Sequence, residues 1–184
     1  MRSLLPFLHL CAVLAFAAIL LFLQSYVFAQ LNISWLHLDL LAVFVFYVGL
    51  EHHPASAIFK IVFVSLLAEL YSAVPAGFLV TSHMLMMLLG NRLAIWLEMQ
   101  RRQAQVVLFA FLLVIKEGLF AAMLSAMGLH YDAATYIPNR IPGLVATILI
   151  ALPLMEFLAF LDGWFESRVF DAKASSRYSS QALF

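Results

Sequence analysis

Ionisable side chains inside long apolar stretches are the residues of this chain that could carry chemistry. A charge near the centre of a lipid bilayer costs about 2.5–3.5 kcal/mol on insertion scales, so each one needs a compensating contact. We therefore interpret them as candidates for polar contacts within a membrane or with a partner. They are Asp39, Glu69, Arg92, Lys116, Glu117 and Glu156.

Lys116 and Glu117 are consecutive, so on a helix they project about 100° apart and need separate partners. If the apolar stretches that contain Lys116 and Glu156 form neighbouring antiparallel helices, the two side chains come within about a turn of each other in depth. We therefore hypothesise a Lys116–Glu156 contact. Structural contacts within a helical bundle are the favoured interpretation of these charges, followed by a partner-binding polar face. An ion or proton path is the least favoured, because a relay would need more acidic residues at graded depths.

Small residues recur at four-residue spacing in the same two stretches. Such spacing lets helix backbones approach closely, which is how helices associate in lipid. The pattern predicts a tightly packed hairpin of these two helices, with a surface for another membrane protein as the alternative. The small residues are Gly118, Ala122 and Ala126 in the first stretch, and Gly143, Thr147 and Ala151 in the second.

Motifs of soluble enzymes are absent: the chain has no Gly-rich phosphate loop, no Gly-x-Ser-x-Gly and no His-Glu-x-x-His. His52 and His53 are separated from His37 by an apolar segment, which argues against a shared metal ion. His83 is isolated, and we interpret it as a hydrogen-bond partner between helices. The single cysteine, Cys11, lies in an apolar stretch. We expect no catalytic residue, no cofactor, no metal site and no enzymatic activity.

Composition shows what must position these residues. Of the 184 residues, 65% are hydrophobic and 11% are charged, and mean hydropathy is +1.01. Soluble domains are about 45–50% apolar and about 25% charged, so lipid is the expected solvent. Ten Lys and Arg balance ten Asp and Glu, which gives no reason to expect nucleic acid as a partner.

Six apolar segments predict an all-α integral membrane protein, a six-transmembrane-helix bundle. The first segment is longer than the apolar core of a signal peptide, so we expect an uncleaved anchor helix there. Residues 1–161 form the predicted transmembrane domain and residues 162–184 a polar cytoplasmic tail. The expected spans are about 6–29, 36–50, 57–73, 77–97, 104–128 and 141–161.

The second span is short, since 15 residues reach only about 22 Å across roughly 30 Å of hydrocarbon. Positive charges nevertheless favour counting it. With six spans and a cytoplasmic N-terminus, Arg2, Arg101 and the tail cations all face the cytoplasm, and Lys60 and Arg92 can reach that face by snorkelling. The second span then requires a locally thinned bilayer or shelter by neighbouring helices.

Two segments of the chain resemble the family of the rod shape-determining protein MreD. Residues 69–77 (ELYSAVPAG) are similar to the family's acidic residue followed by a Leu/Ile-x-Ser-Gly/Ala-x-x-x-Gly turn between two membrane helices. Residues 38–41 (LDLL) and 46–50 (FYVGL) are similar to its Pro-Asp/Asn-x-x-Leu-Leu…Tyr-x-x-Leu segment. Leu38 stands where the family usually has Pro, and Ala73 where it often has Gly. An acidic residue in the fifth span is a further family feature, which Glu117 could supply.

The resemblance implies a non-catalytic scaffold of the bacterial cell-wall elongation machinery, in the inner membrane with both termini cytoplasmic. Such proteins maintain rod shape with an MreC-like periplasmic coiled-coil protein. Through it they are linked to MreB filaments, a RodA-type glycosyltransferase and a class B penicillin-binding protein. The implied fold is similar to that of the substrate-binding subunits of energy-coupling-factor transporters.

That similarity supplies the alternative function, a small-molecule (vitamin) binding subunit of such a transporter. It would need a pocket near the outer face with converging polar and aromatic groups. The candidates are Trp35, His37, Tyr71, His83 and Tyr136. The first segment lacks the Ala-x-x-x-Ala spacing expected for docking a coupling protein, which favours the scaffold.

Overall fold

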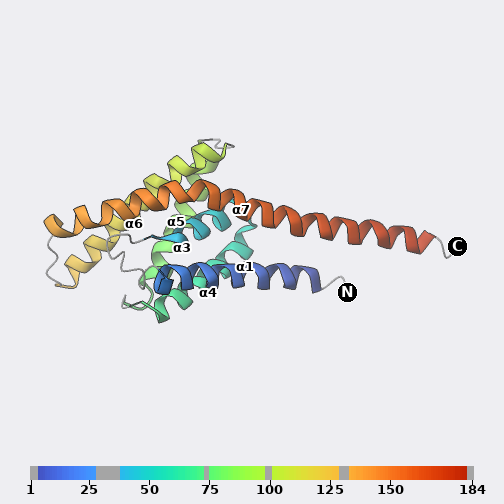
Figure 1. Cartoon of the computed structure of the whole chain (residues 1–184), viewed down its shortest axis with the longest axis horizontal. Coiled ribbons are helices and arrows are strands. Elements are labelled where there is room, and N and C mark those ends of the chain that lie inside the picture. The colour runs from blue at the N-terminus through green and yellow to red at the C-terminus, as the bar shows by residue number, and fades with distance from the viewer. Residues whose placement is uncertain (1–3, 28–37, 73–74, 98–100, 129–132, 182–184) are drawn as a thin grey trace.

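The computed structural model describes residues 4–27, 38–72, 75–97, 101–128 and 133–181, and the side chains of its last helix at positions 139–165. Within these ranges the chain is helical and has no strand (Figure 1). The fold is therefore all-α, as predicted. Its elements are α1 (Leu4–Phe22), the π-helical η1 (Leu23–Val27), α3 (Leu40–Glu51), α4 (Pro54–Leu70), α5 (Phe78–Trp96), α6 (Arg102–Ala126) and α7 (Ala133–Gln181).

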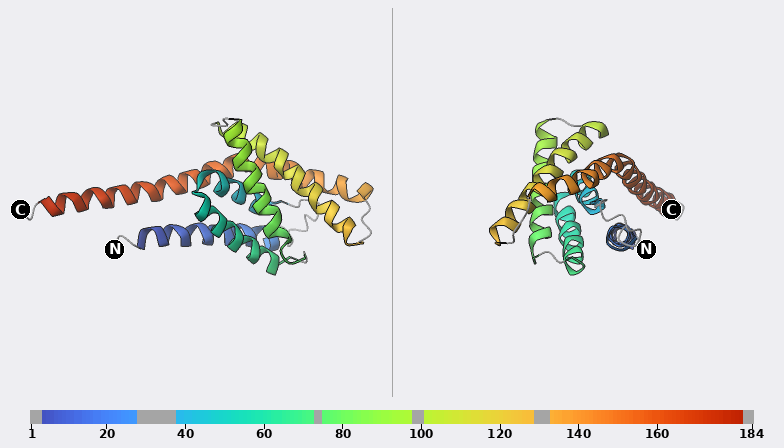
Figure 2. Two further views of the ribbon diagram at one scale, coloured as in Figure 1. Left: turned by 180° about the vertical axis from the view of Figure 1, so that it is seen from behind. Right: turned by 60° about the vertical axis from the view of Figure 1, so that its left-hand side comes forward.

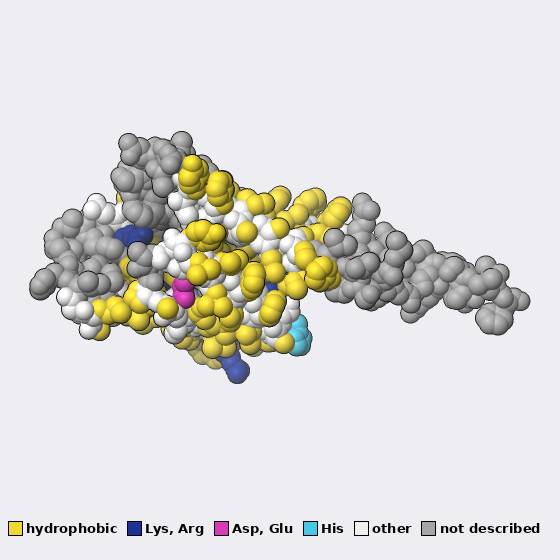
Figure 3. All heavy atoms as spheres, turned by 90° about the horizontal axis from the view of Figure 1, so that it is seen from below, with side chains coloured by type: hydrophobic (Ala, Val, Ile, Leu, Met, Phe, Trp, Pro, Cys, Tyr) yellow, Lys and Arg dark blue, Asp and Glu magenta, His cyan; other side chains and the backbone are white. Residues whose placement is uncertain are grey.

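Among the described residues, three segments are long and apolar enough to cross a membrane: Phe78–Trp96, Arg102–Met123 and Asn139–Phe165. Hydrophobic side chains cover most of the described surface on the face shown in Figure 3. A large exposed apolar surface is typical of a chain that contacts lipid. Leu10–Tyr26 and Leu40–Glu51 are shorter apolar helices, so the count of six spans and the sides of the termini stay predictions.

Helix α3 is the centre of the fold. Its residues from Leu40 to Gly49 are all buried, and it packs against α1, α4, α5, α6 and α7. A helix that is hydrophobic on every side must be buried, either in a protein core or in lipid, and here other helices bury it. Two arrangements were expected for the short second segment, a thinned bilayer or shelter by neighbouring helices. The structure shows shelter by neighbouring helices.

The turn between α4 and α5 is built from the residues that carried the family resemblance. The Glu69 carboxylate accepts hydrogen bonds from the backbone N–H groups of Gly77 (2.9 Å) and Val80 (3.0 Å). Gly77 has φ of +83°, a left-handed conformation that side chains with a Cβ disfavour. The acidic residue thus caps the N-terminus of α5, which explains its spacing from the glycine; residues 73 and 74 lie outside the described part.

Helix α7 runs for 49 residues without a break. It includes the predicted sixth span and continues through most of the predicted tail, up to Gln181. The start of α1 and the end of α7 extend toward the same end of the molecule, beyond the crossing helices α5 and α6 (Figure 2).

Candidate functional site

An ion pair between Lys116 and Asp39 joins α6 to the start of α3. Lys116 is only 8% exposed. The hypothesised Lys116–Glu156 contact is wrong, since Lys116 pairs with Asp39 and Glu156 is exposed on α7. The second apolar segment, and not the sixth, supplies the counter-charge.

Asp39 also organises the N-terminus of α3. Its carboxylate accepts a hydrogen bond from the N–H of Ala42 (3.0 Å), and its own N–H donates to Oγ1 of Thr147 on α7 (3.0 Å). The side-chain oxygen of Gln24, in η1, accepts from the N–H of Leu41 (3.2 Å). Helix N-termini leave backbone N–H donors without partners. Here the Asp39 cap and side chains from η1 and α7 accept hydrogen bonds from the backbone N–H groups at the start of α3.

His83 and Ser65 extend this cluster toward α4 and α5. The imidazole Nδ1 of His83 lies 2.8 Å from the hydroxyl oxygen of Ser65, so the interpretation of His83 as a hydrogen-bond partner between helices is confirmed. His83 also interacts electrostatically with Lys116 and Asp39. Its Nε2 is buried and has no hydrogen-bond partner among the described residues. We call Asp39, Ser65, His83, Lys116 and Thr147 the polar centre.

A second cluster, which the sequence did not predict, lies at the other end of α3. Oδ2 of Asp162 on α7 accepts a hydrogen bond from the Tyr47 hydroxyl (2.7 Å) and lies 3.1 Å from Nε2 of His52. Nδ1 of His52 lies 2.8 Å from Nζ of Lys60. Lys60 was expected to snorkel, but it is only 2% exposed. We call Tyr47, His52, Lys60 and Asp162 the end cluster.

Glu51 and Arg102 flank the end cluster at the junction of α3 and α6. Nη1 of Arg102 donates to the Glu51 carboxylate (2.8 Å), and its guanidinium lies 5.6 Å from the centre of the Tyr47 ring. The end cluster therefore links α3, α4 and α7, and Arg102 connects it to α6. The available signal in the sequence was that Asp162 is the first acidic residue after the sixth apolar segment.

The remaining predicted charges are placed differently. The Glu117 carboxylate lies 3.8 Å from Nε of Arg140, so it joins α6 to α7 outside the polar centre. Arg92 and Glu156 are exposed. Of the six predicted ionisable candidates, the structure brings only Asp39 and Lys116 together in the polar centre.

The two stripes of small residues behave differently. Gly143, Thr147 and Ala151 are buried on α7. On α6, Gly118, Ala122 and Ala126 are exposed, and a Cβ added at Gly118 would meet no atom within 4 Å. The prediction that both stripes pack together in a hairpin is wrong for α6, because that helix turns Leu113 and Lys116 inward instead.

No group of three or more His, Cys, Asp or Glu side chains that could hold a metal ion occurs in the described part of the chain. No family model, curated protein or solved structure matches the sequence. Function must therefore be inferred from the geometry of the two clusters, together with the resemblance of the α3 and α4–α5 segments.

Proposed function

We propose that this chain is a non-catalytic membrane scaffold of the bacterial cell-wall elongation machinery, which maintains rod shape by binding an MreC-like partner. It would lie in the inner membrane with both termini in the cytoplasm. The observation that supports this most directly is the role of the two acidic residues in the family-like segments. Asp39 and Glu69 each hold the start of a helix, α3 and α5, through side-chain contacts with backbone N–H groups.

The pairing of the buried charges supports a structural role over a catalytic one. Asp39 and Lys116 neutralise each other, and Glu117 lies beside Arg140. Pairs of this kind offset the cost of placing charge in lipid. The first pair holds the short central helix α3 against α6 and the second joins α6 to α7, as a scaffold with defined outer faces requires.

The exposed stripe of Gly118, Ala122 and Ala126 on α6 is the face that we assign to a partner helix within this proposal. Small side chains allow close approach of a second helix in lipid. The MreC-like protein would contribute its single membrane span. A RodA-type glycosyltransferase and a class B penicillin-binding protein would join through that contact.

The experiment is affinity purification from the native membrane, comparing Ala122→Leu on the stripe with Ala15→Leu on the exposed face of α1. Both substitutions add the same volume at an exposed position. The proposal expects the wild type and Ala15→Leu to retain elongation proteins, and Ala122→Leu to lose most of them. Recovery of an ATPase-bearing transport module with a bound vitamin would contradict the scaffold.

The vitamin-binding alternative has less support from the described residues. His83 is buried and hydrogen-bonded to Ser65, while Tyr71 is 74% exposed. The two do not converge on a common pocket. Trp35 and His37 lie outside the described residues, as does the side chain of Tyr136.

A further inference from the structure

His52 contacts two other helices through the two nitrogens of its ring. It is the C-cap residue of α3. Its Nε2 lies 3.1 Å from Oδ2 of Asp162 on α7, and its Nδ1 lies 2.8 Å from Nζ of Lys60 on α4. One imidazole therefore stands between a carboxylate and a buried amine that belong to different helices.

The chemistry of these two neighbours indicates which nitrogen of His52 carries a proton. An ionised carboxylate only accepts hydrogen bonds, and an ammonium only donates them. A proton on Nε2 therefore suits Asp162, and a bare Nδ1 suits Lys60. This arrangement is the neutral imidazole, because the charged ring is a donor at both nitrogens.

A protonated His52 cannot keep its contact with Lys60. Two N–H donors of like charge would then face each other across the 2.8 Å between Nδ1 and Nζ. Lys60 is only 2% exposed, and a buried ammonium that loses its acceptor is strongly destabilising. The contact with Asp162 has the opposite response, since a charged imidazole beside a carboxylate forms a stronger, charge-assisted pair.

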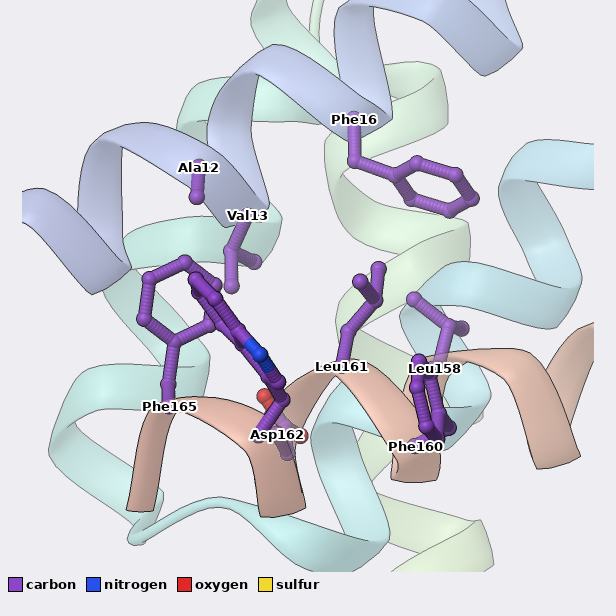
Figure 4. A pocket seen from close by; sticks show the side chains of 9 residues that line it. Ala12, Val13, Phe16, Leu158, Phe160, Leu161, Asp162 and Phe165 are labelled. Carbon is purple, nitrogen blue, oxygen red and sulfur yellow. The ribbon is translucent and has the colours of Figure 1, made fainter. Parts of the chain in front are cut away.

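The other charged and titratable groups around His52 are engaged in contacts of their own. The Tyr47 hydroxyl donates to Asp162 (2.7 Å), and Glu51 pairs with Arg102 of α6 (2.8 Å). Protons can reach the site, because the side chains of His52 and Asp162 are 11% and 22% exposed. Figure 4 shows Asp162 on α7 among the side chains that line an apolar groove between α1 and α7.

We propose that His52 is a pH-sensitive switch between α4 and α7. The neutral ring accepts a hydrogen bond from Lys60 and holds the first turns of α4 against the end of α3. Protonation releases Lys60 and leaves His52 paired with Asp162. Histidine is the side chain that ordinarily changes charge between about pH 5 and pH 8, so the switch responds in that range. The proposal goes beyond the scaffold role and does not depend on it.

The first test is thermal unfolding of the full chain in one detergent at about pH 8 and about pH 5. Acid favours the state that lacks the Lys60 contact, so the wild type should unfold several degrees lower at the acidic pH. Lys60→Met removes the opposing ammonium and should lose most of this acid-induced decrease, as should His52→Gln. His53→Gln is the matched control and should keep the decrease, because the neighbouring imidazole is exposed.

Lys60→Gln is the second variant in case Lys60→Met fails to fold. Its amide can donate to a bare Nδ1 or accept from a protonated one, so it should also lose the acid-induced decrease. A decrease of wild-type size in the folded Lys60 variant would overturn the proposal.

The second test is ¹⁵N spectroscopy of the histidine rings, which reads the proton positions directly. The signals of His52 are assigned by their loss in His52→Gln. They should show a proton on Nε2 and a bare Nδ1 at about pH 8, and protons on both nitrogens at about pH 5. A proton on Nδ1 at the higher pH, or a ring that stays neutral at the lower one, would overturn the switch. Loss of elongation proteins from Ala122→Leu has no bearing on either test.

Discussion

Lys116 of α6 pairs with Asp39, the residue that caps the N-terminus of α3. The negative carboxylate at this position also interacts favourably with the helix dipole. One side chain thus neutralises a buried cation and fixes the start of the central helix. The pair therefore ties the start of α3 to α6.

Lys116→Met should destabilise the fold by about 3–5 kcal/mol, since it leaves the Asp39 charge without its partner. Asp39→Asn in the same chain should recover part of that loss, because the amide oxygen can still cap α3. The coupling is measured as a double-mutant cycle from unfolding in a defined detergent. Glu156→Gln, at an exposed position, is the control and should change stability little; absence of coupling between positions 39 and 116 would contradict the ion pair.

Lys116 was correctly predicted to need a counter-charge, but the predicted partner, Glu156, was the wrong residue. Asp39 supplies the negative charge instead. Asp39 lies within the predicted second span, residues 36–50, whereas α3 has only 12 residues and is enclosed by other helices. Its cap consequently lies at the depth of Lys116. The short length of the second apolar segment pointed to an enclosed helix. Only the packing of the neighbouring helices, however, shows whether a short segment spans or is enclosed.

The α6 stripe was misjudged for a different physical reason. In a soluble helix the apolar face identifies the core. In lipid both faces of α6 can be apolar, so the spacing of Gly118, Ala122 and Ala126 does not say which face points inward. The interpretation of His83 succeeded because a polar side chain inside an apolar stretch needs a partner wherever it points.

Glu69→Ala should weaken the start of α5. The carboxylate satisfies two backbone donors, those of Gly77 and Val80, and loss of a capping side chain costs about 0.5–2 kcal/mol. Hydrogen exchange should therefore rise for the first turn of α5 before it rises in α3. Glu156→Ala serves as the matched control. Unchanged exchange in that turn would show that the cap contributes little.

Gly77→Ala and Gly118→Ala should have opposite effects on stability. Gly77 has φ of +83°, and a left-handed backbone costs a residue with a Cβ about 1–2 kcal/mol. Gly118 lies within α6 with open space around its Cα, where alanine is favoured over glycine by about 0.8–1.0 kcal/mol. Thermal unfolding of the two variants beside the wild type provides the measurement, and an equal change in both would refute this assignment.

Tyr47→Phe isolates the contribution of the end cluster. The substitution keeps the ring under the Arg102 guanidinium and removes only the hydroxyl that donates to Asp162. A hydrogen bond to a charged group contributes about 1.5–3 kcal/mol, so the variant should unfold more readily by about that amount. Tyr26→Phe, at an exposed position in η1, is the matched control.

The same variant tests whether Asp162 ties α7 to α3. If it does, Asp162→Asn should lower stability in the wild-type background and have a smaller effect in Tyr47→Phe, because the two changes remove one shared contact. The two effects are compared by unfolding of the single and double variants in the same detergent. Purely additive losses would mean that Tyr47 and Asp162 stabilise the fold independently, and would contradict a link between α3 and α7 through this hydrogen bond.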